Sequence, residues 1–137
     1  MSEKIDIRIT NDLSEIERVQ NLIDAFGKER GLIRTTVLNM QLAAEELLSN
    51  IISYGYEDDD EHTITLHIAH EDTAVTIRIR HDADPFNPME LPEPKIEASL
   101  EDMTIGGLGI HLIKQMMDGF EFIREGKYST IVLSIDI

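Results

Sequence analysis

The 137-residue sequence has no cysteine, so neither a disulfide bond nor a thiolate metal site is available to it. Long apolar runs are also missing, since no stretch approaches the roughly 18 consecutive apolar residues of a membrane-spanning helix. The first ten residues, MSEKIDIRIT, lack the apolar segment of a signal peptide. These absences favour a cytoplasmic protein, and the length favours a single domain that spans residues 1–137.

Positive charge is also scarce, with 12 Lys and Arg residues against 27 Asp and Glu residues and a net charge of −15. Binding to nucleic acid or to an anionic membrane requires a basic surface, so this charge argues against both partners. A small anionic ligand remains compatible with it, because a few backbone N–H groups can hold a phosphate locally. A basic region on a protein partner would be attracted to the acidic surface.

The periodicity of the apolar residues predicts five strands and three helices. The strands are expected at residues 4–10, 62–69, 73–80, 119–125 and 129–137, and the helices at residues 13–26, 36–54 and 110–117. Asn11 or Asp12 can cap the first helix. The first, second and third helices are expected to end at Gly31, Gly55 and Gly119, respectively. Since the strands alternate on one side only, we expect an α+β two-layer sandwich. Its mixed or antiparallel sheet is covered on one face by about three helices.

The periodicity disappears between residues 81 and 106, where all four prolines lie. A connection this long without regular structure is unusual in a compact domain and is often a functional lid. It leads into a turn of Gly106, Gly107, Leu108 and Gly109 that opens directly into the third helix. Backbone N–H groups at such a helix N-terminus can hold an anion, and glycine lets the backbone approach it closely. A flexible hinge and cap is an equally good explanation.

Glu46 and Asn50 lie four residues apart, so both side chains project from one face of the second helix. An Asn oxygen suits Mg²⁺, which prefers few protein oxygens together with phosphates and water. A carboxylate one turn away can accept a proton from a hydroxyl group or a water molecule. The alternative is a solvated helix face, because further polar residues share this arc, namely Asn39, Glu45, Ser49 and Ser53.

The stretch HDADPFNP, residues 81–88, directly follows a predicted strand. An Asp at the end of a buried strand can accept a hydrogen bond from an adenine amino group. An ordinary Asx-type turn with prolines is the alternative, and taken alone it is the better one. The five histidines have no metal-ligand spacing, and His62 and His67 are expected to be solvated on the polar side of a strand.

The order of these stretches resembles that of the Bergerat-fold (GHKL) ATPases, with Glu46 and Asn50 in the N-box, residues 81–88 in the G1 box and GGLGIHL in the G2 box. Within that superfamily the chain is most similar to the small anti-sigma-factor serine/threonine kinases of bacteria. Three further elements carry this resemblance: Tyr54-Gly55-Tyr56, Pro85-Phe86-Asn87-Pro88 and Met117-Asp118. The resemblance covers most of the chain from about residue 41 onward.

The resemblance implies that ATP and Mg²⁺ are the cofactors and that residues 89–106 form an ATP lid. Glu46 would be the general base toward a serine hydroxyl, and Asn50 would hold the Mg²⁺ against the phosphates. The backbone N–H groups of Gly106, Gly107, Leu108 and Gly109 would bind the phosphates. His81, Asp82 and Ala83 would occupy the G1 box, and Thr130 would lie near the adenine.

The resemblance also implies protein partners: an anti-anti-sigma protein of the STAS type as substrate, a sigma factor and a second copy of the chain. One departure concerns the G1 box, where His81 occupies the position of the adenine-binding Asp and Ala83 that of a Gly. Asp82 cannot simply replace that Asp, because neighbouring residues of an extended chain point to opposite sides. The departure motivates a second hypothesis, in which the chain is a partner-switching binding module that needs no nucleotide.

Overall fold

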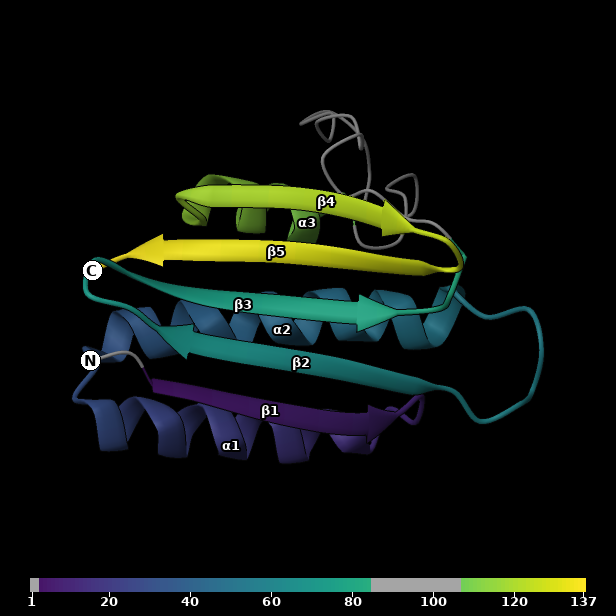
Figure 1. Cartoon of the computed structure of the whole chain (residues 1–137), viewed down its shortest axis with the longest axis horizontal. Helices are drawn as coiled ribbons and strands as arrows, with labels where there is room; N and C mark the ends of the chain where they lie inside the picture. Colours follow the sequence, from purple (N-terminus) through teal and green to yellow (C-terminus); the bar gives the residue numbers. More distant parts are fainter. Residues whose placement is uncertain (1–2, 85–106) are drawn as a thin grey trace.

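The computed structural model describes residues 3–84 and 107–137, and in this part of the chain five strands form one sheet (Figure 1). The strand order is β1-β2-β3-β5-β4, and every neighbouring pair is antiparallel. The element bounds are β1 Glu3–Thr10, α1 Glu15–Arg30, α2 Arg34–Tyr54, β2 Thr63–His70, β3 Ala74–His81, α3 Gly107–Met116, β4 Gly119–Glu125 and β5 Tyr128–Asp136.

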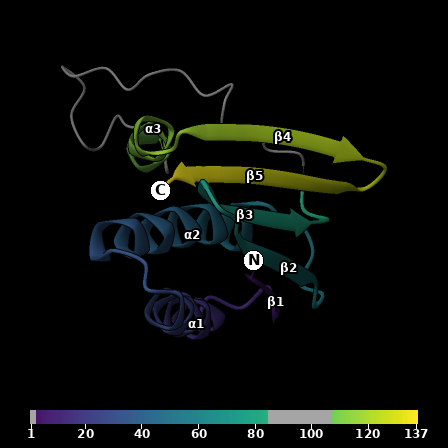
Figure 2. The same cartoon turned by 60° about the vertical axis from the view of Figure 1, so that its left-hand side comes forward.

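The three helices lie along one side of the sheet, as Figure 2 shows, so the predicted α+β two-layer sandwich is confirmed. The core fills the space between the layers and includes Ile9, Leu47, Ile77 and Leu133, each at most 1% exposed. Burying an Ile or Leu side chain contributes about 1.5–3 kcal/mol, so this layer provides the main stabilisation. Among the helices of the described residues, none is long and apolar enough to cross a membrane.

The first helix begins later than the cap prediction places it. Helix α1 starts at Glu15, and the Asp12 carboxylate accepts hydrogen bonds from the Ser14 backbone N–H at 2.9 Å and the Ser14 hydroxyl at 2.8 Å. These contacts form a local turn before the helix, a conformation that Asp side chains stabilise well. The predicted end is confirmed, because Gly31 adopts a left-handed φ of 68° that favours glycine.

Helix α2 ends against the turn that follows β3. Its last residue is Tyr54, and the Gly55 N–H donates to the Ile51 carbonyl at 2.9 Å. The Asp84 N–H donates in turn to the Gly55 carbonyl at 2.8 Å. A Cβ placed on Gly55 would lie 2.7 Å from the Cβ of Ala83, so the two segments are in direct contact. The end of the helix and the start of the predicted G1 box are therefore fixed to each other.

Candidate functional site

The candidate site residues from several elements gather at one end of the sheet. The C-terminal end of α2, the ends of β3 and β4 and the start of β5 all lie at the right-hand end of Figure 1. Glu46 and Asn50 come from the C-terminal half of α2, and His81 is the last residue of β3. The fold thus brings the predicted N-box and the beginning of the predicted G1 box to the same part of the molecule.

Glu46 and Asn50 are both half-buried, whereas Glu45 and Ser53 on the same arc of α2 are exposed. Burial raises the pKa of the Glu46 carboxyl, and the charge of Glu45 raises it further, while the amide of Asn50 opposes part of this shift. The Asn50 Nδ2 is buried and forms no hydrogen bond of good geometry within the described residues. This part of the helix is therefore not a simple solvated face.

This pair of side chains is chemically suited to a reacting hydroxyl group and a bound phosphate. A carboxyl group whose pKa is raised toward neutrality is a better match for proton transfer at physiological pH. A buried amide Nδ2 without a well-aligned acceptor is uncommon in folded proteins, and an oxygen of a bound ligand is one way to satisfy it. Within the described residues, no cluster of three or more His, Asp or Glu could hold a metal ion by itself.

His81 is fully buried on the face of the sheet that the helices cover. Its Nδ1 accepts a hydrogen bond from the Ala83 N–H at 3.2 Å, and its Nε2 is buried without a partner in the described part of the chain. Burial lowers the pKa of His81 to about 4, against the opposing charge of Asp82, and the positive charge of Arg124 lowers it further. The imidazole is therefore neutral at physiological pH.

Asp82 points away from His81, as the alternation of an extended chain requires. Its carboxylate lies 3.2 Å from the Nδ1 of His62, whose Nε2 lies 2.7 Å from the Asp58 carboxylate. The His62 ring stacks on Tyr56 with 4.2 Å between ring centroids. Burial and the neighbouring Asp82 raise the pKa of the Tyr56 hydroxyl. The prediction that His62 is solvated was wrong, because tertiary contacts hold it between two carboxylates.

The structure does not bring Thr130 to the other candidate residues. Thr130 lies on the open face of the sheet, opposite Arg80 in the register of β3 and β5. Its neighbour Ser129 faces the helices, is fully buried and lies opposite His81. Sequence reasoning missed Ser129, although the alternation that buries Ile131, Leu133 and Ile135 in β5 places it on the same face.

The glycine-rich turn lies only partly within the described residues. Gly107, Leu108 and Gly109 form the first turn of α3, so backbone N–H groups of this segment belong to a helix N-terminus. Gly106, the proposed lid at residues 89–106 and the turn at residues 85–88 lie outside the described residues. The phosphate-binding role of the turn remains a prediction.

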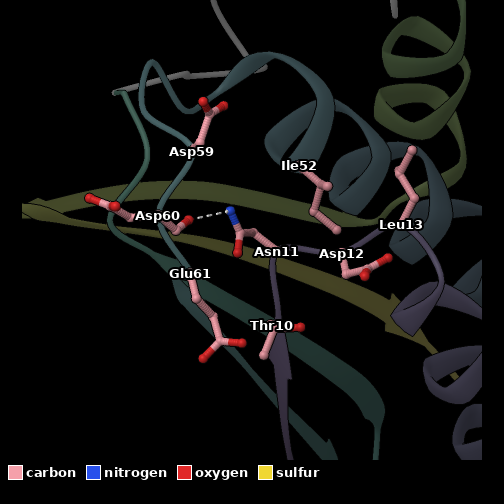
Figure 3. A pocket seen from close by; sticks show the side chains of 8 residues that line it. All are labelled: Thr10, Asn11, Asp12, Leu13, Ile52, Asp59, Asp60 and Glu61. Carbon is pink, nitrogen blue, oxygen red and sulfur yellow. Dashed lines mark hydrogen bonds between the residues drawn. The ribbon is translucent and has the colours of Figure 1, made fainter.

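A hollow of about 480 Å³ lies between the start of α1 and the loop that precedes β2 (Figure 3). Its lining is strongly acidic and includes Asp12, Asp59 and Glu61. On its lining, the Asn11 amide donates a hydrogen bond to the Asp60 backbone carbonyl at 3.2 Å. Glu46, Asn50 and His81 are not among its lining residues, so this hollow is separate from the candidate site.

The fold and the candidate site agree with a match to a known family. The family model of the histidine kinase-like ATPase domain matches residues 9–135, which is nearly the whole chain. The chain therefore belongs to the histidine kinase-like ATPases, the GHKL superfamily, and its predicted resemblance to the anti-sigma-factor kinases is confirmed at the level of this family.

Three relatives illustrate the similarity. The serine/threonine-protein kinase BtrW of Bordetella bronchiseptica is 24% identical over 69% of this chain and 67% of its own length. The serine-protein kinase RsbW of Listeria monocytogenes is 18% identical over 96% of this chain and 87% of its own length. The RsbW of Bacillus cereus is 22% identical over 90% of this chain and 79% of its own length.

The contacts of His62 predict that its contribution to stability depends on pH. Hydrogen bonds to Asp58 and Asp82 raise the pKa of His62 in the folded state, above about 6.5 for an unfolded histidine. The stabilisation is thus fully present below the unfolded pKa and is lost as the pH rises through the folded pKa. We expect His62→Asn to lower the melting temperature more at pH 6 than at pH 9. Thermal unfolding measures this, with His70→Asn as control because the His70 ring accepts a hydrogen bond from Arg30, and an equal loss at both pH values would contradict the prediction.

Proposed function

We propose that the chain is an ATP-binding serine/threonine protein kinase of the anti-sigma-factor type. In this proposal it phosphorylates an anti-anti-sigma protein of the STAS type and sequesters a sigma factor. The observation that carries the proposal is the half-buried pair of Glu46 and Asn50 on one face of α2, with a raised carboxyl pKa and a buried amide Nδ2 that makes no well-aligned hydrogen bond. The names of the relatives, which are serine or serine/threonine kinases, support the same conclusion.

Each residue has a specific role in this proposal. Glu46 accepts the proton of the substrate serine, and its raised pKa brings it closer to the pH at which it works. The Asn50 side-chain oxygen holds Mg²⁺, which commonly takes one or two protein oxygens and completes its shell with phosphates and water. Backbone N–H groups of Gly107, Leu108 and Gly109 at the start of α3 bind phosphate oxygens. Bound ATP supplies the phosphoryl group, and the protein contributes positioning and charge neutralisation.

The partners and the location belong to the same proposal. We infer a cytoplasmic single-domain ATPase that functions as a homodimer and regulates transcription through its sigma factor. The net charge of −15 would attract a basic region of a protein partner and speed its association at low ionic strength. Neither nucleic acid nor an anionic membrane is a suitable direct partner for such a surface.

A calorimetric titration of the full chain with ATP and ADP, in Mg²⁺ and in EDTA, tests the nucleotide site. We expect Mg²⁺-dependent binding that Asn50→Ala weakens by about tenfold or more, since an oxygen contact to the bound metal is lost. The matched control is Asn39→Ala, because Asn39 is also half-buried and lies eleven residues earlier on nearly the same face of α2. Equal affinities for the wild type and Asn50→Ala would remove Asn50 from the site.

A second function is favoured by His81, which replaces an expected carboxylate with a neutral imidazole. In this alternative the chain is a partner-switching module that binds its protein partner without nucleotide. Partner capture that is unchanged in EDTA, without ATP and in Asn50→Ala would support it. Strict dependence of capture on ATP would exclude it.

A further inference from the structure

Three polar side chains form a row across neighbouring strands on the helix-facing side of the sheet. Arg124 of β4 lies opposite Ser129 of β5, and Ser129 lies opposite His81 of β3. We call these three residues the donor row. They lie at the end of the sheet where α2 ends, because Ala83, two residues after His81, packs against Gly55. The donor row is therefore on the same side of the sheet as Glu46 and Asn50, near the predicted base-binding end of the site.

The hydrogen bonds of His81 determine which of its ring nitrogens carries the proton. The Ala83 N–H points at Nδ1 from 3.2 Å, so Nδ1 is the acceptor. A neutral imidazole has one acceptor and one donor nitrogen, and the proton is thus assigned to Nε2. This Nε2–H is buried and has no partner within the described residues. The group that it faces in a complex should therefore be a hydrogen-bond acceptor.

The other two members of the row also present donors. The Arg124 Nη1 donates to the Ser129 Oγ at 2.9 Å, so the Ser129 hydroxyl proton remains available to a second acceptor. Arg124 has no acceptor atom, and its remaining N–H groups can only donate. Ser129 and His81 are fully buried, whereas Arg124 is exposed, so the two buried members determine the cost of a mismatched ligand group. A carboxylate acceptor, which would suit an amino group on the ligand, is absent from this row.

The purine bases differ in the groups that they offer to such a row. Guanine presents the O6 carbonyl and N7 as acceptors, whereas adenine presents an amino group, a donor, at the position of O6. A donor placed against a donor leaves both groups without a partner, and this is costly at a buried position. We propose that the donor row makes this nucleotide site select 6-oxopurine nucleotides, such as GTP and ITP, over ATP. The proposal rests on the proposed nucleotide-binding function and concerns the ranking of bases, because ATP retains ring acceptors.

Calorimetric titration of the full chain with GTP, ITP and ATP in Mg²⁺ tests the proposal directly. We expect GTP and ITP to bind about tenfold more tightly than ATP, the difference that one mismatched buried hydrogen bond produces. ITP carries the 6-carbonyl without the 2-amino group of guanine. Binding of GTP but not ITP would therefore assign the selection to another contact and overturn the proposal.

A substitution at His81 supplies the converse measurement. His81→Asp replaces the Nε2–H donor with acceptor oxygens, so we expect the ranking to reverse in favour of ATP. The matched control is His70→Asp in β2, where the new carboxylate can still accept the hydrogen bond that Arg30 now gives to His70. This control should retain the wild-type ranking. If His81→Asp does not fold, the wild-type ranking alone decides the question.

The outcomes separate this proposal from the proposed function. Equal or tighter binding of ATP by the wild type would overturn the base selection and leave the nucleotide site intact. Failure of all three nucleotides to bind at millimolar concentration would overturn the nucleotide-binding function as well. Tighter binding of both GTP and ITP than of ATP would support the base selection and the nucleotide-binding function.

Discussion

Replacement of Glu46 by Gln is expected to lower the rate of phosphoryl transfer by about 10²- to 10⁴-fold, the usual contribution of a general base. Gln has nearly the same size as Glu and cannot accept the serine proton at neutral pH. Nucleotide affinity should remain close to that of the wild type, because the proposed phosphate and metal contacts come from other residues. The rate is measured as single-turnover transfer of the phosphoryl group from a radiolabelled nucleoside triphosphate to a STAS-domain protein that the wild-type chain phosphorylates. Transfer at the wild-type rate would remove Glu46 as the base.

The pH dependence of the same reaction provides an internal check. Because burial raises the pKa of Glu46, the carboxylate is lost on acidification at a higher pH than for an ordinary Glu, whose pKa is about 4.3. The transfer rate should therefore fall on the acid side through this raised pKa. Glu45→Gln is the matched control, since the charge of Glu45 contributes to the shift and its side chain is exposed. This variant should retain activity, and the acid-side fall of its transfer rate should move toward lower pH because the pKa of Glu46 is raised less.

The sheet and its helical cover were predictable because their signals are local. Alternation with a period of two gives each strand a buried face, and a shift by one residue would expose the whole apolar set. The register of β2 with β3, in which Ile68 lies opposite Ile77 and Leu66 opposite Ile79, follows from that rule. Gly31 could be recognised as a helix end for the same reason, because a left-handed residue at that position favours glycine.

The candidate site was less predictable because it depends on which elements meet. A helical wheel places Glu46 and Asn50 on an arc with exposed residues, and only the packing of α2 decides that these two are half-buried. His62 likewise has polar neighbours along the chain, while its partner Asp82 lies twenty residues away. The adenine-side role of Thr130 stays a prediction, but the alternation of β5 places its side chain on the open face and that of Ser129 on the helix-facing side. The contact of Gly55 with Ala83 has no local signal at all.

That contact leads to the largest expected effect on stability, in Gly55→Ala. An added Cβ would lie 2.7 Å from the Ala83 Cβ and 2.6 Å from the Ile51 carbonyl oxygen, so one segment must move. The φ of −86° at Gly55 is allowed for alanine, and the cost is therefore steric. We expect a loss of about 1–3 kcal/mol in the free energy of unfolding, as for other overpacked sites. Urea denaturation measures this loss.

The same substitution should weaken nucleotide binding, because moving the turn after β3 disturbs the hydrogen bonds of Ala83 and Asp84 that hold it. The double variant Gly55→Ala/Ala83→Gly removes one of the two close contacts and should recover part of both losses, which a double-mutant cycle quantifies. Gly126→Ala is the control, since a Cβ there meets nothing within 4 Å and its cost comes from a φ of 60°. It should lower stability and leave nucleotide affinity unchanged. If Gly55→Ala behaves in the same way, the end of α2 does not position the turn.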